Sequence, residues 1–128
     1  MPTSGVLDAS VLLAIILGEI GAADAKPWLA NACIGTVNLS EVVARLADLG
    51  FTAEFIDEGL AELDLDIRPF DRAQAERAGL LRPQTRRLGL SFGDRACLAL
   101  AAELERVAVT ADRAWTGLDI GVEIELIR

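Results

Sequence analysis

The sequence contains no histidine, a single lysine and only two cysteines. Without histidine the chain cannot form a Ser-His-Asp triad, a histidine-activated nucleophile or a histidine-ligated zinc site. Cys33 and Cys97 are far apart and lack C-x-x-C spacing, which argues against a redox pair or a zinc site and favours two buried, inert thiols. Because no glycine-rich loop precedes a Lys-Ser or Lys-Thr pair, a P-loop is excluded. The remaining possibilities are an enzyme whose carboxylates bind a hard cation such as Mg²⁺ or Mn²⁺, or a protein without catalytic activity.

Aromatic residues are also scarce, at 5% of a chain that is 52% hydrophobic. Such a core must be built from Leu, Val, Ile and Ala. The 128 residues suffice for one domain, 1–128, with a substantial core. The longest apolar run, Ala9 to Leu17, contains Ser10 and is too short to span a bilayer. With no positive N-terminal region and no paired cysteines, we expect a cytoplasmic protein that does not enter a membrane.

Positive charge is scarce as well, and the net charge is -8. This balance argues against a general nucleic-acid coat protein, which would be basic. It does not exclude a nuclease, because bound cations reverse the field of an acidic site. Arg82, Arg86 and Arg87 form the only concentrated basic segment. Arg86 and Arg87 are candidates for binding RNA phosphates, since guanidinium matches phosphate bidentately, or they are simply solvated surface charges.

The hydrophobic pattern alternates between short apolar strands and amphipathic helices. Strands are predicted at 5–7, 33–37, 63–67, 107–109 and 122–127. Because helices separate these strands, we expect an α/β fold with a central, mostly parallel five-stranded sheet covered on both faces.

Several helix boundaries are suggested by capping residues and breakers. We expect a helix over 22–32 with a break near Pro27, and another that begins at Asn38 and stops at Gly50. Thr52, Asp71 and Ser91 are predicted to begin three further helices, and Pro83 to end the one that starts at Asp71. Asp71, with Gln74 three residues on, is assigned to capping alone.

Four acids stand where a strand gives way to a helix: Asp8, Glu41, Asp94 and Asp112. Each has an ordinary structural explanation. Asp8 can cap its helix, and the helix dipole favours a negative charge at Asp112. The segments 38–41 and 91–94 match the capping-box pattern. Four such acids at one sheet edge would nevertheless repel one another unless a cation neutralised them. Two or three carboxylates with waters satisfy octahedral Mg²⁺, so the joint pattern favours a metal site.

The segments LDASVLLA, NLSEVVARL, LRPQTRRLGLSFGDRACLALA and VTADRAW resemble those of PIN-domain ribonucleases, and more narrowly the VapC toxins of bacterial toxin-antitoxin pairs. The resemblance covers nearly the whole chain. It implies a PIN-like three-layer α/β sandwich, Mg²⁺- or Mn²⁺-dependent endoribonuclease activity, dimerisation and inhibition by a cognate antitoxin. The family's acidic positions fall on Asp8, Glu41, Asp94 and Asp112, with no departure at any of them.

For these acids we expect metal-assisted hydrolysis of an RNA phosphodiester by one or two cations. Asp8 and Asp94 are the first choice for direct metal ligands, with Asp112 next. Glu41 is placed as a ligand through water or as the group that orients the attacking water. The hydroxyls of Ser10 and Thr110 either orient these carboxylates or serve as local caps.

Other roles stay open at this point. Arg95 and Arg113 each follow a proposed ligand and either pair with the acids or face the substrate. The helices within 42–63 carry more apolar side chains than one face can bury, among them Phe51, Phe55 and Ile56, which suggests a protein partner. The main alternative is a catalytically silent PIN-like scaffold that acts by binding protein or RNA. A receiver or phosphatase built around Asp8 is disfavoured, because the required second Asp and late Lys are missing.

Overall fold

The structure, a computed structural model, describes residues 4–128. Its centre is a five-stranded sheet with the order β3-β2-β1-β4-β5, and every neighbouring pair is parallel. The strands are β1 (Gly5–Leu7), β2 (Ala32–Gly35), β3 (Asp66–Arg68), β4 (Val107–Thr110) and β5 (Ile124–Leu126). The predicted α/β class with a five-stranded parallel sheet is therefore confirmed.

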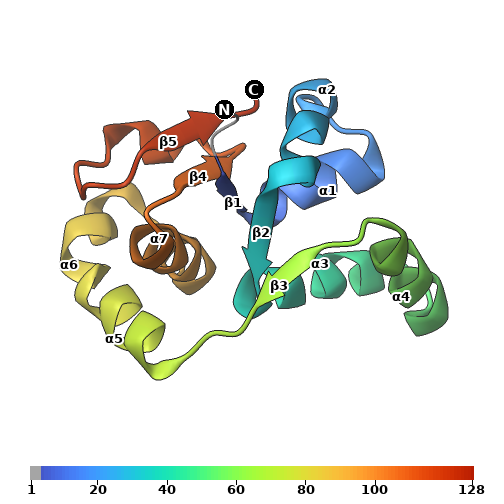
Figure 1. The fold of residues 1–128 in the computed structure, drawn as a ribbon, viewed down its shortest axis with the longest axis horizontal. Coiled ribbons are helices and arrows are strands. Elements are labelled where there is room, and N and C mark those ends of the chain that lie inside the picture. Colours follow the sequence, from blue (N-terminus) through green and yellow to red (C-terminus); the bar gives the residue numbers. More distant parts are fainter. Residues whose placement is uncertain (1–3) are drawn as a thin grey trace.

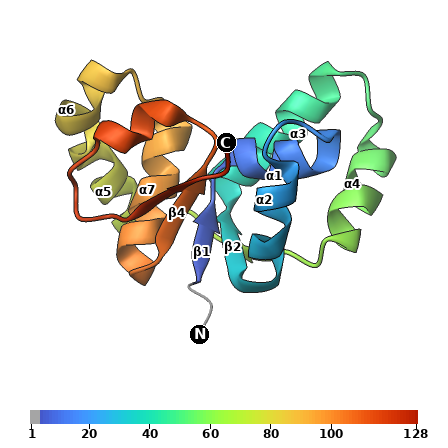
Figure 2. The same ribbon diagram turned by 90° about the horizontal axis from the view of Figure 1, so that it is seen from above.

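Helices cover both faces of the sheet, so that the molecule has three layers (Figures 1 and 2). One face carries α1 (Ala9–Leu17), α2 (Ala22–Ala25), the 3₁₀ helix η1 (Lys26–Asn31), α3 (Thr36–Asp48) and α4 (Ala53–Glu62). The other carries α5 (Arg72–Leu80), α6 (Arg82–Thr85) and α7 (Phe92–Leu104), with the 3₁₀ helices η2 (Arg86–Leu88) and η3 (Arg113–Gly117). No helix within 4–128 has the length and apolar character needed to cross a membrane.

Alternation along the buried strands divides the core into two clusters. Leu7, Ile34 and Val109 face α1 and α3. Their neighbours Val6, Cys33 and Ala108 face α7 and the buried ring of Trp115. Because both faces of these strands are covered, the strands are apolar throughout, as parallel sheets require.

The strands and several helix boundaries differ from the sequence prediction. Strand β2 ends at Gly35 and α3 begins at Thr36, so Asn38 lies inside the helix and does not start it. Strand β3 holds only Asp66–Arg68, because Leu63 still belongs to the C-terminal cap of α4. Pro83 lies in the first turn of α6, where a missing N–H leaves no hydrogen bond unmade, and α5 has already ended at Leu80.

Other boundaries agree with the prediction. Thr52 caps α4 by accepting from the Phe55 amide, and Asp71 caps α5 by accepting from the Gln74 amide. The predicted helix over 22–32 is present as α2 and η1, and Pro27 occupies the first turn of η1.

Since all five strands run in one direction, their carboxyl ends meet at one edge of the sheet. This edge receives the starts of α1, α3 and α7 and the loop after β4. Open parallel sheets place their functional sites at such an edge.

Candidate active site at the carboxyl edge of the sheet

Asp8 is the most buried of the four acids, with 5% of its surface exposed. It follows β1 directly and occupies the N-cap position of α1, yet its side chain makes no capping hydrogen bond there. Instead Oδ2 accepts from the Ser10 hydroxyl at 2.7 Å and from the Thr110 hydroxyl at 2.9 Å. The simple capping explanation for Asp8 is therefore wrong.

The two hydroxyls tie the end of β1 to the end of β4. Ser10 Oγ and Thr110 Oγ1 lie 3.4 Å apart, and Ser10 Oγ accepts from the Ala111 amide at 3.0 Å. Thr110 Oγ1 accepts from the Asp112 amide at 3.1 Å. This network holds the Asp8 carboxylate in place and links it to the backbone that carries Asp112. Of the two roles left open for Ser10 and Thr110, the contacts favour orientation of a carboxylate.

Glu41 lies on the second turn of α3, and its carboxylate is positioned by Asn38 and Gly93. Asn38 is buried, and its side-chain amide donates to Glu41 Oε1 at 2.9 Å and to the Gly93 carbonyl at 3.0 Å. A Cβ atom at Gly93 would overlap the Glu41 carboxylate. Glycine at position 93 therefore leaves room for the Glu41 carboxylate, which a larger residue would displace from this position. The predicted capping box over 38–41 is wrong, because Asn38 binds Glu41 from within the helix.

Asp94 lies in the first turn of α7 and completes a true capping box. Its Oδ2 accepts from the Ser91 amide at 2.8 Å, and Ser91 Oγ accepts from the Asp94 amide at 3.2 Å. Asp112 is exposed and caps η3, since Oδ1 accepts from the Ala114 amide at 2.9 Å. For these two acids the capping role is present, and it leaves the second oxygen of each carboxylate for another ligand.

The four acids interact electrostatically, although they come from four separate segments of the chain. Burial, together with the negative charges of Asp94 and Glu41, raises the pKa of Asp8 to about 6, although the hydrogen bonds from Ser10 and Thr110 oppose this rise. Burial also raises the pKa values of Glu41 and of Asp94; the charge of Asp94 adds to the first and that of Asp112 to the second. The sequence prediction that these acids meet at one edge is consistent with this mutual repulsion.

The four carboxylates are chemically suited to bind a hard divalent cation. They offer only carboxylate oxygens, which Mg²⁺ and Mn²⁺ prefer, and a bound cation would stabilise the ionised form of the buried Asp8. Within residues 4–128, however, no three His, Cys, Asp or Glu side chains lie close enough together to surround one ion. Asp94 and Asp112 each direct one oxygen to the backbone of their own helix. The metal site therefore stays a prediction.

The arginines named from the sequence do not pair with the acids. In the part of the chain that the structure describes, salt bridges join only Arg68 to Asp66 and Arg72 to Glu76. Arg95 donates through Nη1 to the Ala78 carbonyl at 2.9 Å.

Of the other arginines, one lies in a groove with an acid of the candidate site and two do not. Arg86 and Arg87 are exposed on η2, where the described contacts place neither beside an acid. Arg113 lines an open groove with Ser10, Asp112 and Arg128, and Arg128 had no signal in the sequence to mark it.

Comparison with known proteins identifies the class. The family model described as PIN domain matches residues 5–120, and the chain therefore belongs to the PIN domain family. No curated protein sequence matches the chain.

Solved structures of toxin-antitoxin proteins share its fold. A toxin-antitoxin complex from Klebsiella pneumoniae is 20% identical, with a TM-score of 0.76 and 98% of each chain covered. VapBC-5 from Mycobacterium tuberculosis is 27% identical, with a TM-score of 0.63 and 99% of each chain covered. VapC20 from the same organism, a sarcin-ricin loop cleaving toxin, is 16% identical, with a TM-score of 0.73 over 94% of this chain and 99% of that one. The resemblance to PIN-domain and VapC proteins is thus confirmed.

Replacing Asp8 by Asn is expected to stabilise the protein in a pH-dependent way in the presence of EDTA. The folded-state pKa lies above the ordinary value, so the ionised carboxylate opposes folding at high pH, and this penalty is absent below the unfolded pKa of 3.8. Asn removes the penalty and can still accept from both hydroxyls. We expect a gain on the order of 2–3 kcal/mol at pH 8 that shrinks as the pH falls through 6 and disappears near pH 4.

Urea unfolding at a series of pH values measures this gain. Asp71→Asn, at an exposed helix cap, serves as the matched control and should show no comparable pH-dependent gain. An equal effect of Asp8→Asn at pH 4 and pH 8 would contradict the assignment of Asp8 as a buried carboxylate that opposes folding when ionised.

Proposed function

We propose that the chain is a Mg²⁺- or Mn²⁺-dependent endoribonuclease and the toxin of a toxin-antitoxin pair. The observation that carries the proposal is the mutual influence of Asp8, Glu41, Asp94 and Asp112 at the carboxyl edge of a parallel sheet, in a chain without histidine. Membership of the PIN domain family and the likeness to a VapC protein described as cleaving the sarcin-ricin loop support it.

In this proposal Asp8 and Asp94 hold the cation directly, with Asp112 as the next ligand. The cation, when bound, would lower the pKa of a water molecule to supply hydroxide and would stabilise the negative charge that develops on the phosphate. Ser10 and Thr110 keep Asp8 oriented by donating to Oδ2, which leaves Oδ1 without a hydrogen bond from these hydroxyls and free to bind the cation if one is present.

Glu41 has a separate task in the proposal. Asn38 fixes Oε1, which leaves Oε2 to orient the attacking water and accept its proton. The raised pKa of Glu41 makes it a better proton acceptor than an ordinary surface carboxylate.

Replacing Asp8 or Asp94 by Asn is expected to abolish RNA cleavage while the protein stays folded. Each change removes a full charge that would bind the cation, and we expect the cleavage rate to fall by roughly 10²-fold or more. Cleavage of total cellular RNA with Mg²⁺, followed by mapping of new 5′ ends, measures the effect. Asp71→Asn removes the charge of a carboxylate that only caps a helix, and it should cleave normally.

The alternative is a catalytically silent scaffold. Near-wild-type cleavage by either site variant would overturn the assignment of the site. Absence of cleavage by the wild type, together with a melting temperature that divalent cations leave unchanged, would favour the scaffold.

The exposed arginines of η2 are proposed to steer RNA toward the site. Replacing Arg86 and Arg87 together by Ala should weaken RNA binding and reduce the slope of log affinity against log salt by roughly 0.7 for each phosphate that the protein no longer binds. Binding measured at several salt concentrations tests this. A double variant that cleaves RNA normally but escapes the antitoxin would assign these arginines to protein binding. A variant unchanged in both respects would mark them as surface charge.

A separate apolar groove is proposed to bind the antitoxin. It is lined by residues of α1, α3 and α4, and it has a volume of about 310 Å³. On its α4 side Phe51 and Phe55 stack with ring centres 5.3 Å apart, and 39% and 61% of their surfaces are exposed. The excess of apolar side chains predicted for 42–63 is thus concentrated beside one groove, and several solved relatives are described as complexes of this type.

The charge around this groove indicates the chemistry of the partner. Helix α4 carries Glu54, Asp57, Glu58 and Glu62, and the sequence has no Lys or Arg between Arg45 and Arg68. An amphipathic antitoxin segment with basic flanks is complementary to such a surface. Homodimerisation and a cytoplasmic location are also proposed; the two free, buried cysteines suit the latter.

Phe55→Ala is expected to weaken antitoxin binding by roughly 30-fold, because removal of an aromatic anchor commonly has an effect of this size. Calorimetric titration of the cognate antitoxin measures the change. Leu80→Ala, at a 78% exposed residue on α5, is the matched control and should bind normally. Equal binding by both variants would place the antitoxin elsewhere.

A further inference from the structure

Two aromatic rings and an arginine form a shelf at the carboxyl edge of the sheet, composed of Phe70, Phe92 and Arg95. The rings of Phe70 and Phe92 meet edge to face, with centres 5.5 Å apart and planes at 86°. The guanidinium carbon of Arg95 lies over the Phe92 ring, 5.9 Å from its centre. Phe92 remains 50% exposed, although a ring of this size is normally buried.

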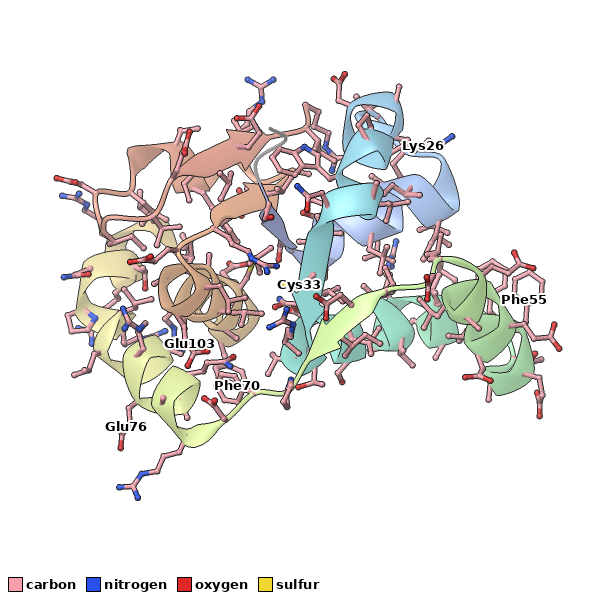
Figure 3. The ribbon with its side chains drawn as sticks, in the orientation of Figure 1. Lys26, Cys33, Phe55, Phe70, Glu76 and Glu103 are labelled. Carbon is pink, nitrogen blue, oxygen red and sulfur yellow. The ribbon has the colours of Figure 1, made fainter. Side chains whose placement is uncertain are left out.

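The shelf is held firmly by the surrounding backbone. The Phe70 amide donates to Thr36 Oγ1 at 3.0 Å, which attaches the loop after β3 to the start of α3. Arg95 is fixed by the Ala78 carbonyl of α5. Figure 3 shows Phe70 between the end of β3 and α5, far from Phe55 on α4. The shelf is therefore separate from the apolar groove.

The shelf and two acids of the candidate active site meet at the start of α7. Phe92 is followed directly by Gly93, whose Cα packs against the Glu41 carboxylate. One residue further is Asp94, in the same first turn of α7. The exposed Phe92 thus precedes the glycine that packs against Glu41 and lies in the same first turn of α7 as Asp94.

We propose that Phe92 stacks against an unpaired base of single-stranded RNA whose backbone passes the four acids. This inference rests on the proposed ribonuclease function and names a substrate contact that the acids cannot make. Aromatic rings accept any base, because every base has a π face, and stacking does not depend on positive charge. Arg95 and Phe70 contact the Phe92 ring, and the exposed half of Phe92 is available to the base.

The surroundings favour a base over a protein segment as the occupant. Of the two rings of the shelf, Phe92 is exposed and Phe70 is half-buried, whereas a protein-binding site normally offers a larger contiguous apolar patch. The cation over the ring also suits a neighbouring phosphate backbone. Contact with a protein is the rival outcome that the experiment must distinguish.

The test compares two probes of equal charge: a 12-nucleotide oligoadenylate and a 12-residue ribose-phosphate chain without bases. Binding is measured with Asp94→Asn, which keeps the probes uncut. We expect oligoadenylate to bind more tightly, and Phe92→Ala to lower that preference roughly tenfold. The salt dependence of binding should not change, because the variant still binds the same phosphates.

Two further variants separate stacking from a disturbance of the fold. Phe92→Leu keeps an apolar side chain without an aromatic face and should lose the preference as Phe92→Ala does. Phe92→Trp should keep it, and its added fluorescence should be quenched by oligoadenylate and not by the chain without bases. Leu80→Ala is the control for removing an exposed apolar side chain and should retain the full preference.

Each outcome decides the proposal. If RNA binds tightly and the preference survives in both Phe92→Ala and Phe92→Leu, the shelf is not a stacking site, while the proposed nuclease function stands. If those variants bind RNA normally and no longer bind the antitoxin, the shelf is a protein contact. If the wild type neither binds nor cleaves RNA, the stacking site and the nuclease function both fail.

Discussion

The structure depends on one unfavourable arrangement: a carboxylate buried at the end of β1, where the negative charges of Asp94 and Glu41 also act on it. Asp8 could gain a local hydrogen bond by capping α1, but its side chain turns to Ser10 and Thr110 instead. Burial and neighbouring charges raise its pKa to about 6. Folding alone does not favour such a position. A carboxylate that is buried at this cost, and held by the hydroxyls of Ser10 and Thr110, is a candidate for a functional role such as the metal site proposed above.

At the same edge of the sheet, the starts of two helices also hold acids by hydrogen bonds. Asp94 and Asp112 each accept from a backbone amide. For Asp94 this hydrogen bond favours the ionised carboxylate, while burial and the charge of Asp112 oppose it. Capping and ligand binding are therefore not exclusive explanations. A carboxylate has two oxygens, and a helix start can hold one while the other faces the site. Glu41 obtains the same result from Asn38, with Gly93 providing the space.

The sequence predicted the layers of the fold and the four acids because those signals are local. Buried strands are short apolar runs, and each acid lies close to the end of one or to the start of a helix. The boundary at Asn38 was misplaced because the segment Asn38 to Glu41 matches a capping box, while the true start of α3 has no side-chain cap at all. The closeness of Gly93 to the Glu41 carboxylate and the contact of Phe70 with Phe92 could not be predicted, because both depend on how distant segments pack.

The scarcity of positive charge is consistent with the aromatic RNA contact that we propose at Phe92. A chain with a net charge of -8 gains little general attraction for a polyanion, and its acids repel RNA at the very edge where cleavage is proposed. Arg113 and Arg128 flank the groove beside Asp112, and Arg86 and Arg87 lie apart on η2. Stacking supplies affinity that needs no positive charge and persists as salt rises. For the proposed nuclease function, an acidic chain with four carboxylates at one edge of its sheet therefore has a physical reason to hold its substrate by a base as well as by phosphates.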